Sequence, residues 1–185
     1  MRTPDLLGHC LAAAMLGMGL AILSGCATPA RPEHMATPPV AHVSASLLGK
    51  VAIAGVSGGK ETIRWFPNPI PEVGNKELSE ALRLSLQQAG YLSPAPDAAP
   101  ITVKVGVVSV DKAGGYTLTV TTLIRYVVAD QEGGKPLFDE LVTASCTRGV
   151  ADDSYGVTRL KHTEECAVRK NIASFLTKLG AADIQ

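Results

Sequence analysis

Apolar and polar positions change their period several times between residues 47 and 180, and each change predicts a structural element. An apolar run at 48–56 predicts a strand, and helical spacing predicts helices at 75–90 and 157–179. Three further strands are expected between residues 101 and 149, with turn signals at 112–115 and 131–136. The order β-α-β-β-β-α predicts an α+β two-layer sandwich, with a four-stranded, largely antiparallel sheet and both helices on one face.

Alternation within the strands predicts which side of the sheet is buried. In the middle strand of the three, one set of alternate side chains is apolar and the other is mostly threonine. The apolar set is Leu118, Val120, Ile124, Tyr126 and Val128, and the polar set is Thr117, Thr119, Thr121 and Arg125. One face should therefore pack against the helices while the other stays wetter. At the helix ends, Asn75 is predicted as an N-cap, and Gly90 and Gly180 as the glycines that end the two helices.

Residues 1–46 show neither the helical nor the strand period of apolar residues. Residues 6–23 are almost entirely apolar and lead to the small-residue sequence Leu23-Ser24-Gly25-Cys26, which is typical of a secretory signal. An uncleaved membrane anchor is the alternative, because roughly 20 apolar residues can span a bilayer. Residues 27–46 hold four prolines and no apolar period, which predicts a tether. We therefore expect a signal peptide at 1–25, a modified Cys26 with a Pro-rich tether to 46, and one periplasmic α+β domain at 47–185.

The segment Leu23–Cys26 resembles a bacterial lipobox. This resemblance implies that the Cys26 thiol carries diacylglycerol, that the chain is cut just before it, and that the new amine is acylated. Two or three acyl chains would hold the protein on a membrane essentially permanently, whereas one binds only marginally. The resemblance also implies the periplasmic leaflet of the outer membrane rather than the inner membrane, since the next residue is Ala27 and not an aspartate. No other cofactor is expected.

The layout as a whole also carries a resemblance. A lipobox and a Pro-rich tether precede the β-α-β-β-β-α order, the first helix ends in the sequence of residues 86–91, and the last contains that of residues 166–172. This layout resembles small uncharacterised proteobacterial envelope lipoproteins. It is similar to the lipopolysaccharide-assembly lipoprotein and YajG-like groups, which implies a periplasmic domain on a lipid anchor.

Composition excludes several classes of function. The 17 basic and 17 acidic side chains give no net charge, and aromatic residues make up 4% of the chain, so neither a basic footprint nor a stacking platform for nucleic acid is present. The loop after the first strand contains Gly59-Lys60, but Ala54 and Glu61 replace the first glycine and the hydroxyl residue of a nucleotide-binding loop. No nucleotide or nucleic-acid partner is expected.

No catalytic set is predicted, and the protein is expected not to be an enzyme. The chain has no GxSxG motif, and the predicted domain contains a single histidine, His162. The carboxylate pairs Asp152-Asp153 and Glu164-Glu165 are predicted to lie on solvated faces. His34 and His42 in the tether are interpreted as incidental rather than as ligands.

Four cysteines allow a simple prediction. Cys10 leaves with the signal peptide and Cys26 is lipidated, so Cys146 and Cys166 remain and should pair in an oxidising compartment. The competing hypothesis is an open zinc site formed by these two thiols and His162, which lies four residues before Cys166. It ranks below the disulfide because exported thiols oxidise, and His162 is otherwise expected to face solvent.

Trp65 and Phe66 are the candidate partner-binding residues. They lie among prolines, where rigid aromatic side chains can bind a partner or instead close the open end of the core. The leading hypothesis is a non-enzymatic binding or assembly domain for an envelope protein, acting through the wetter sheet face or the Trp65 loop. The alternative is a lipid or glycan carrier or sensor, which would require a large apolar pocket.

Overall fold

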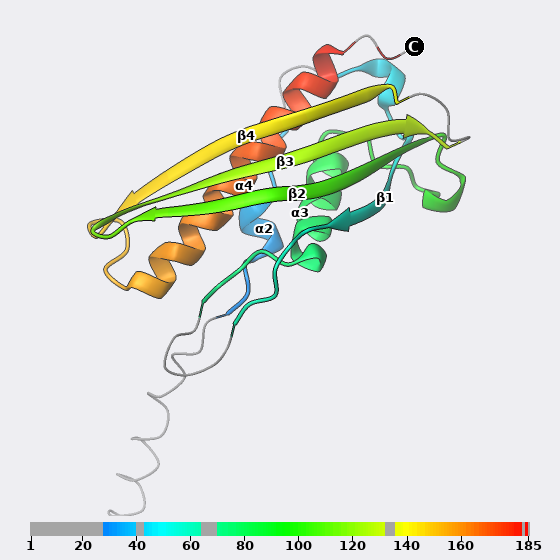
Figure 1. Ribbon diagram of the computed structural model, residues 1–185. Helices are drawn as coiled ribbons and strands as arrows, with labels where there is room; N and C mark the ends of the chain where they lie inside the picture. Colours follow the sequence, from blue (N-terminus) through cyan, green and yellow to red (C-terminus); the bar gives the residue numbers. More distant parts are fainter. Residues whose placement is uncertain (1–27, 40–42, 64–69, 132–135, 183, 185) are drawn as a thin grey trace, which may run out of the picture.

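The structure is a computed structural model that describes residues 28–39, 43–63, 70–131, 136–182 and 184. Four strands form one sheet in the order β1-β2-β3-β4 (Figure 1). Their bounds are β1 Val51–Ser57, β2 Ile101–Gly114, β3 Thr117–Asp130 and β4 Phe138–Gly149. β1 runs parallel to β2, and the other neighbours are antiparallel. The predicted α+β sandwich is confirmed, although the first strand begins at Val51 rather than Leu48.

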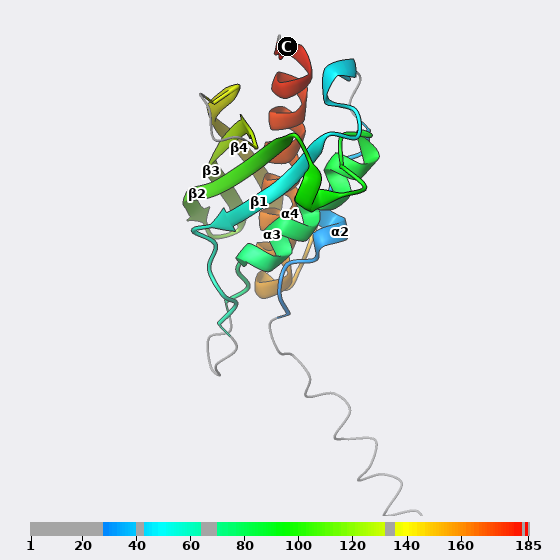
Figure 2. The ribbon, with the colours of Figure 1, turned by 90° about the vertical axis from the view of Figure 1, so that its right-hand side faces the viewer.

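Both long helices cover the same face of the sheet (Figure 2). α3, Asn75–Gln88, packs on β1, and α4, Gly156–Ala181, packs on β3 and β4. Two short 3-10 turns lie between these elements: η2, Ala45–Leu47, precedes β1, and η3, Pro96–Ala98, lies between α3 and β2. The other face of the sheet is left uncovered by any described helix.

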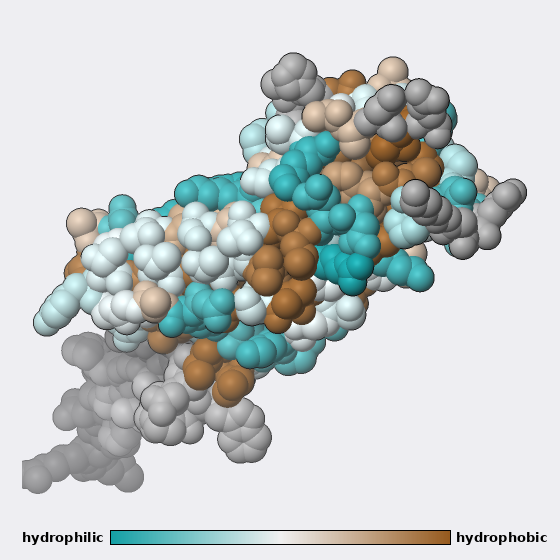
Figure 3. Space-filling view, turned by 45° about the horizontal axis from the view of Figure 1, so that its top comes forward, coloured by the Kyte–Doolittle hydropathy of each residue, from teal (hydrophilic) through white to brown (hydrophobic). Residues whose placement is uncertain are grey.

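Alternation in β3 separates the two faces as predicted. Val120, Ile124, Tyr126 and Val128 are buried under the helices. On the outer face Thr119 and Thr121 form hydroxyl hydrogen bonds to Thr147 and Ser145 of β4, each 2.8 Å long. Figure 3 shows this pale, weakly polar surface interrupted by apolar side chains. On this face Leu141 of β4, which pairs with Arg125 of β3, is exposed.

Aromatic stacking marks the centre of the core. The rings of Tyr126 and Phe175 are stacked with centroids 4.0 Å apart, and Phe138 meets Phe175 edge-on at 5.8 Å. The Tyr126 hydroxyl donates to Asn171 Oδ1 at 2.9 Å, so a buried polar group on the sheet is satisfied by α4. The leucines of α3 close the core on the β1 side.

The helix ends differ in part from the prediction. Gly90 follows α3 with φ of 75°, the left-handed conformation expected of a terminating glycine. Asn75 is the first helical residue and Gly74 is the N-cap, because the Asn75 side chain accepts the Gly59 N–H at 2.8 Å instead of capping its own helix. Gly180 does not end α4, which continues to Ala181, and beyond the helix Ala182 and Ile184 still pack on the core.

The tether prediction is wrong for residues 30–37. This segment includes the short helix α2, Pro32–Met35, and packs against α3 and α4. Met35 is fully buried, and the Thr37 N–H donates to Ser85 Oγ of α3 at 3.1 Å. Proline content suggested a free linker, but a single buried methionine and partners on distant helices hold the segment in place. We call residues 28–37 the N-terminal strap.

No helix within the described residues is long and apolar enough to cross a membrane.

Candidate functional site

The structure forms the disulfide that the sequence predicted. Cys146 of β4 and Cys166 of α4 are bonded, with Cα atoms 5.8 Å apart, and join the sheet to its covering helix. Their sulfurs are therefore not available as thiolate ligands, and the zinc hypothesis with His162 is wrong. No group of three potential metal ligands occurs within the part of the chain that the structure describes.

Three other predicted residues lie outside the described residues. These are Cys26, the expected lipidation site, and Trp65 and Phe66, the expected partner-binding pair. Lipidation and binding through these side chains therefore stay predictions.

The pair Glu164-Glu165 is buried, which corrects the prediction of a solvated face. Glu164 is fully buried and Glu165 is 2% exposed. Glu164 is covered by β2 and by the loop before α3, whereas Glu165 is covered by the N-terminal strap. No local sequence pattern predicts the burial of these two carboxylates, because their partners lie up to 134 residues away along the chain.

The buried Glu164 forms a charge cluster with Lys112 and Glu72, which are both partly exposed. Lys112 Nζ lies 2.5 Å from Glu164 Oε1 and 2.9 Å from Glu72 Oε1. Burial raises the pKa of Glu164 to about 7, against the opposing effect of Lys112. Burial alone would lower the pKa of Lys112, but the two carboxylates outweigh it and the pKa is raised. The cluster therefore holds a carboxyl that exchanges a proton near neutral pH.

Glu165 holds the N-terminal strap. It accepts the Arg31 N–H at 2.8 Å and contacts His34 Nδ1 at 2.9 Å. Lys161, one turn earlier on α4, donates to Thr28 Oγ1 at 2.6 Å, and burial lowers the pKa of this lysine. His34, interpreted from the sequence as incidental, is thus part of the contact between the strap and α4.

A second polar group lies beside the disulfide. Asp153 Oδ2 contacts His162 Nδ1 at 3.0 Å and Arg148 at 3.4 Å. His162 is therefore paired rather than simply facing solvent, and Asp153 is mostly buried, contrary to prediction. Together with the strap these side chains line a wide, open depression of about 350 Å³.

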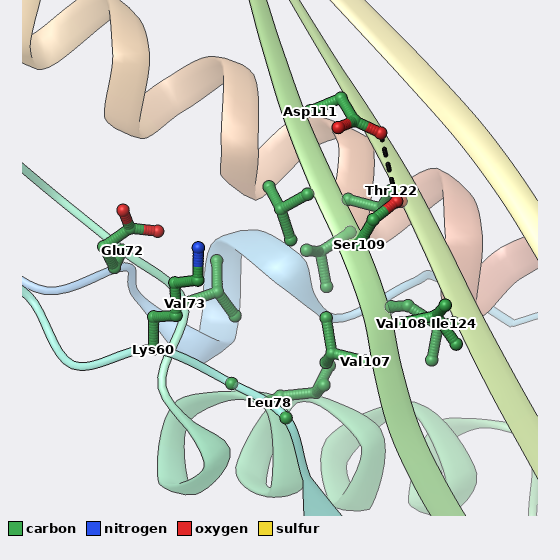
Figure 4. A pocket seen from close by; sticks show the side chains of 14 residues that line it. Lys60, Glu72, Val73, Leu78, Val107, Val108, Ser109, Asp111, Thr122 and Ile124 are labelled. Carbon is green, nitrogen blue, oxygen red and sulfur yellow. Dashed lines mark hydrogen bonds between the residues drawn. The ribbon is translucent and has the colours of Figure 1, made fainter.

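A smaller recess lies between the end of β1 and the middle of β2 (Figure 4). It has a volume of about 220 Å³, and we call it the β1–β2 recess. Its floor is apolar and comes from the sheet and both helices: Val73, Leu78, Val107, Ile124 and Val168. Its mouth carries Lys60, Glu72 and Asp111. Ser109 donates to Asp111 at 3.0 Å, and the described lining contains no histidine or cysteine.

A glycine sets the shape of this mouth. Gly58 has φ of 81°, and a Cβ there would collide with the carbonyl oxygen of Val107. Only glycine combines this backbone conformation with such close approach to β2. The arrangement offers an apolar floor and a mixed-charge rim, which can accommodate an apolar side chain.

The fold defines a class: a four-stranded sheet with a parallel edge strand, covered on one face by two helices. No family model matches the chain, and no curated protein matches its sequence. Among solved structures it is similar to protein XCC0632 from Xanthomonas campestris, described as DUF330, with a TM-score of 0.62, 11% identity, and coverage of 84% of this chain and 96% of that one.

Two further structures share the fold. A protein from Caulobacter crescentus, described as a candidate lipoprotein, has a TM-score of 0.51 at 15% identity, covering 74% of this chain and 92% of that one. The hypothetical protein CT253 from Chlamydia trachomatis has a TM-score of 0.50 at 15% identity, covering 73% and 97%. At these identities the likeness concerns the fold alone. None of the three is described as a lipopolysaccharide-assembly or YajG-like protein, so that part of the resemblance stays a prediction.

Proposed function

We propose that this protein is a lipid-anchored lipoprotein of the bacterial envelope, whose periplasmic domain binds an envelope protein and catalyses no reaction. The anchor is Cys26, acylated on its thiol and amine, in the periplasmic leaflet of the outer membrane. The observation that carries the binding role is the β1–β2 recess, with its apolar floor and charged rim. A docking site of this kind buries an apolar side chain of the partner and orients it by the polar rim.

Three observations support the envelope location. The lipobox Leu23–Cys26 precedes the domain, and the domain contains a disulfide, which persists mainly in oxidising compartments. The fold is shared with the Caulobacter candidate lipoprotein. Each observation alone is general, but an exported, oxidised and anchored chain accounts for all three.

The size of the recess favours a protein partner over a carried lipid or glycan. Pockets for small molecules typically measure about 300–1,000 Å³ and enclose most of the ligand. The β1–β2 recess, at about 220 Å³, holds one or two side chains. Larger depressions among the described residues, of about 350 and 440 Å³, are wide and open to solvent.

The anchor is tested by labelling cells with radioactive palmitate. We expect label in the wild-type protein and none in Cys26→Ala, together with accumulation of the unprocessed chain. Normal processing and membrane association of Cys26→Ala, without label in the wild type, would overturn the anchor.

The binding surface is tested by chemical cross-linking in intact cells, followed by capture from detergent-solubilised membranes and mass spectrometry of proteins and lipids. Val108→Glu changes an exposed residue that lines the recess, and Leu141→Glu is its matched control on the outer sheet face. Loss of one protein partner in Val108→Glu alone supports the recess. Loss in Leu141→Glu alone assigns binding to the outer face, and a stoichiometric lipid without a protein partner supports the carrier function instead.

A further inference from the structure

The distance between the expected anchor and the folded domain is very short. Thr28 is held by Lys161 at 2.6 Å, and the strap behind it is fixed by Glu165 and by the buried Met35. Only Ala27 separates Thr28 from Cys26. Because an extended chain spans at most about 3.6 Å per residue, the Cα atom of Cys26 lies within about 7 Å of that of Thr28. Acyl chains on Cys26 would therefore begin at the surface of the domain and not at the end of a long tether.

This attachment point lies near one end of the molecule. Lys161 lies five residues after Gly156, the first residue of α4, which corresponds to about 8 Å along the helix axis. Figure 2 shows the first described residues of the strap and the start of α4 at the same end, opposite the C-terminus. The side of the domain that a membrane would meet is consequently the end where α4 begins.

Two loops complete this end. Arg159 of the first turns of α4 donates to the carbonyl oxygens of Gly115, at 3.1 Å, and of Asp153, at 2.9 Å. It thereby joins the β2–β3 turn to the loop that precedes α4, and Figure 1 shows both beside the start of the helix. The acidic side chains of that loop are also occupied, since Asp152 accepts the Gly149 N–H at 2.7 Å and Asp153 contacts Arg148 and His162.

The tyrosines are distributed unevenly over the structure. The chain has four, of which Tyr91 and Tyr126 are fully buried in the core. The other two, Tyr116 in the β2–β3 turn and Tyr155 before α4, are 89% and 74% exposed, and Val150 beside them is 43% exposed. Both exposed tyrosines thus lie at the end near the anchor. Tyrosine is enriched at the boundary between membrane and water, because its ring is apolar and its hydroxyl is polar.

We propose that this tyrosine end, formed by Tyr116, Val150 and Tyr155, lies directly on the lipid bilayer, with the two tyrosine rings in the headgroup region. This inference rests on the proposed acylation of Cys26. The occupant of the surface is the membrane itself. The short anchor holds the tyrosine end at the bilayer at high effective concentration, so that weak interfacial contacts suffice to fix the orientation of the domain.

The test uses acylated full-length mature protein in phosphatidylcholine vesicles that contain a headgroup-quencher lipid. A single cysteine at Tyr116→Cys or Tyr155→Cys carries an environment-sensitive fluorophore, while the native disulfide and the acylated Cys26 do not react. Leu137→Cys is the matched control, an exposed apolar position directly before β4, at the other end of this strand from the β2–β3 turn. We expect several-fold stronger quenching and a blue-shifted emission at positions 116 and 155. Equal quenching at all three positions would overturn the proposal.

Two further measurements separate the causes of failure. Intact mass first establishes the acyl chains, so protein without them contradicts the proposed anchor, whereas acylated protein with unquenched tyrosine positions contradicts only the orientation. Inserting a Gly/Ser linker of about twelve residues after Ala27 lengthens the connection and should lower the quenching severalfold. Unchanged quenching in that variant would show that the short anchor does not set the orientation.

Discussion

Both halves of α4 bury side chains against the rest of the domain, but by different means. The second half packs hydrocarbon on the sheet through Val168, Ile172, Phe175, Leu176 and Leu179. The first half buries Thr163 and three charged residues, Lys161, Glu164 and Glu165. Lys161 and Glu165 contact the strap, and Glu164 is paired with Lys112. The second half is thus specified by its own sequence period, whereas the first half is specified by partners on distant segments.

This difference teaches where local patterns are sufficient. Burial of an apolar side chain needs no specific partner, because removing it from water is favourable in any close-packed surroundings. A buried carboxylate is tolerated only where a partner meets it. Disrupting each half should therefore produce different signatures, a large loss independent of pH in one and a pH-dependent change in the other.

The largest effect is expected in the apolar half. Phe175→Ala removes a fully buried ring that is stacked on Tyr126, and should lower the free energy of unfolding by about 3–5 kcal/mol. Thr177→Ala, two residues further on an exposed site, is the control and should change stability by less than about 0.5 kcal/mol. Urea unfolding of the mature domain measures both. Equal losses in the two variants would contradict the packing described for this half.

The disulfide lies at the junction between the halves, and its removal should have the next largest effect. The bridge joins residues 20 apart, so the double variant Cys146→Ser/Cys166→Ser should lose about 3 kcal/mol on the chain-entropy account. Urea unfolding of the wild type with reductant should reproduce this loss. Two free thiols in the intact mass of the unreduced periplasmic protein would refute the bridge.

The polar half should make stability depend on pH through Glu164. Its pKa is raised from 4.5 to about 7 in the folded protein by burial, so the folded state binds this proton more tightly than the unfolded chain. The resulting stabilisation is complete below about pH 4.5 and is lost as the pH rises through 7. Because one pKa unit corresponds to about 1.4 kcal/mol, the expected loss between pH 5 and 8 is about 2.5 kcal/mol.

Glu164→Gln isolates this contribution, because the amide keeps the shape of the carboxylic acid and does not titrate. Lys112, Glu72 and Glu165, whose charges act on Glu164, are all retained in this variant. We expect its urea midpoint to change less between pH 5 and 8 than that of the wild type. A pH dependence identical in the two proteins would assign the effect to other groups.

The apolar half of this comparison could be predicted from sequence, and the polar half could not. Alternation in β3 and the period of α4 placed Val120, Ile124 and Phe175 correctly, and cysteine arithmetic gave the bridge. Glu165 was misjudged because its partners, Arg31 and His34, lie in a proline-containing segment without any periodic signal. The absence of a periodic signal is also the reason why the strap was predicted to be part of a tether.

The candidate site was predictable only in part for a similar reason. The β1–β2 recess is assembled from the loop after β1, from β2 and β3, and from both helices, so no single stretch of sequence contains it. Its one local signal is the glycine-rich loop after β1, in which Gly58 precedes the Gly59-Lys60 pair. The close approach of Gly58 to Val107 shows that the glycine serves backbone packing.

The smallest effect is expected for an exposed ion pair on the apolar half. It can be compared with the Lys112–Glu164 pair of the polar half, which has a similar length but is less exposed. Lys178 and Glu140 lie 2.6 Å apart beside the apolar half, close to the 2.5 Å of Lys112 and Glu164, but are 49% and 44% exposed. Water screens the exposed pair and competes with it, so Lys178→Ala should change the free energy of unfolding by at most about 0.5 kcal/mol. Urea unfolding at low and at high salt measures this effect. A loss above about 2 kcal/mol would mean that distance, rather than burial, decides what these ion pairs contribute.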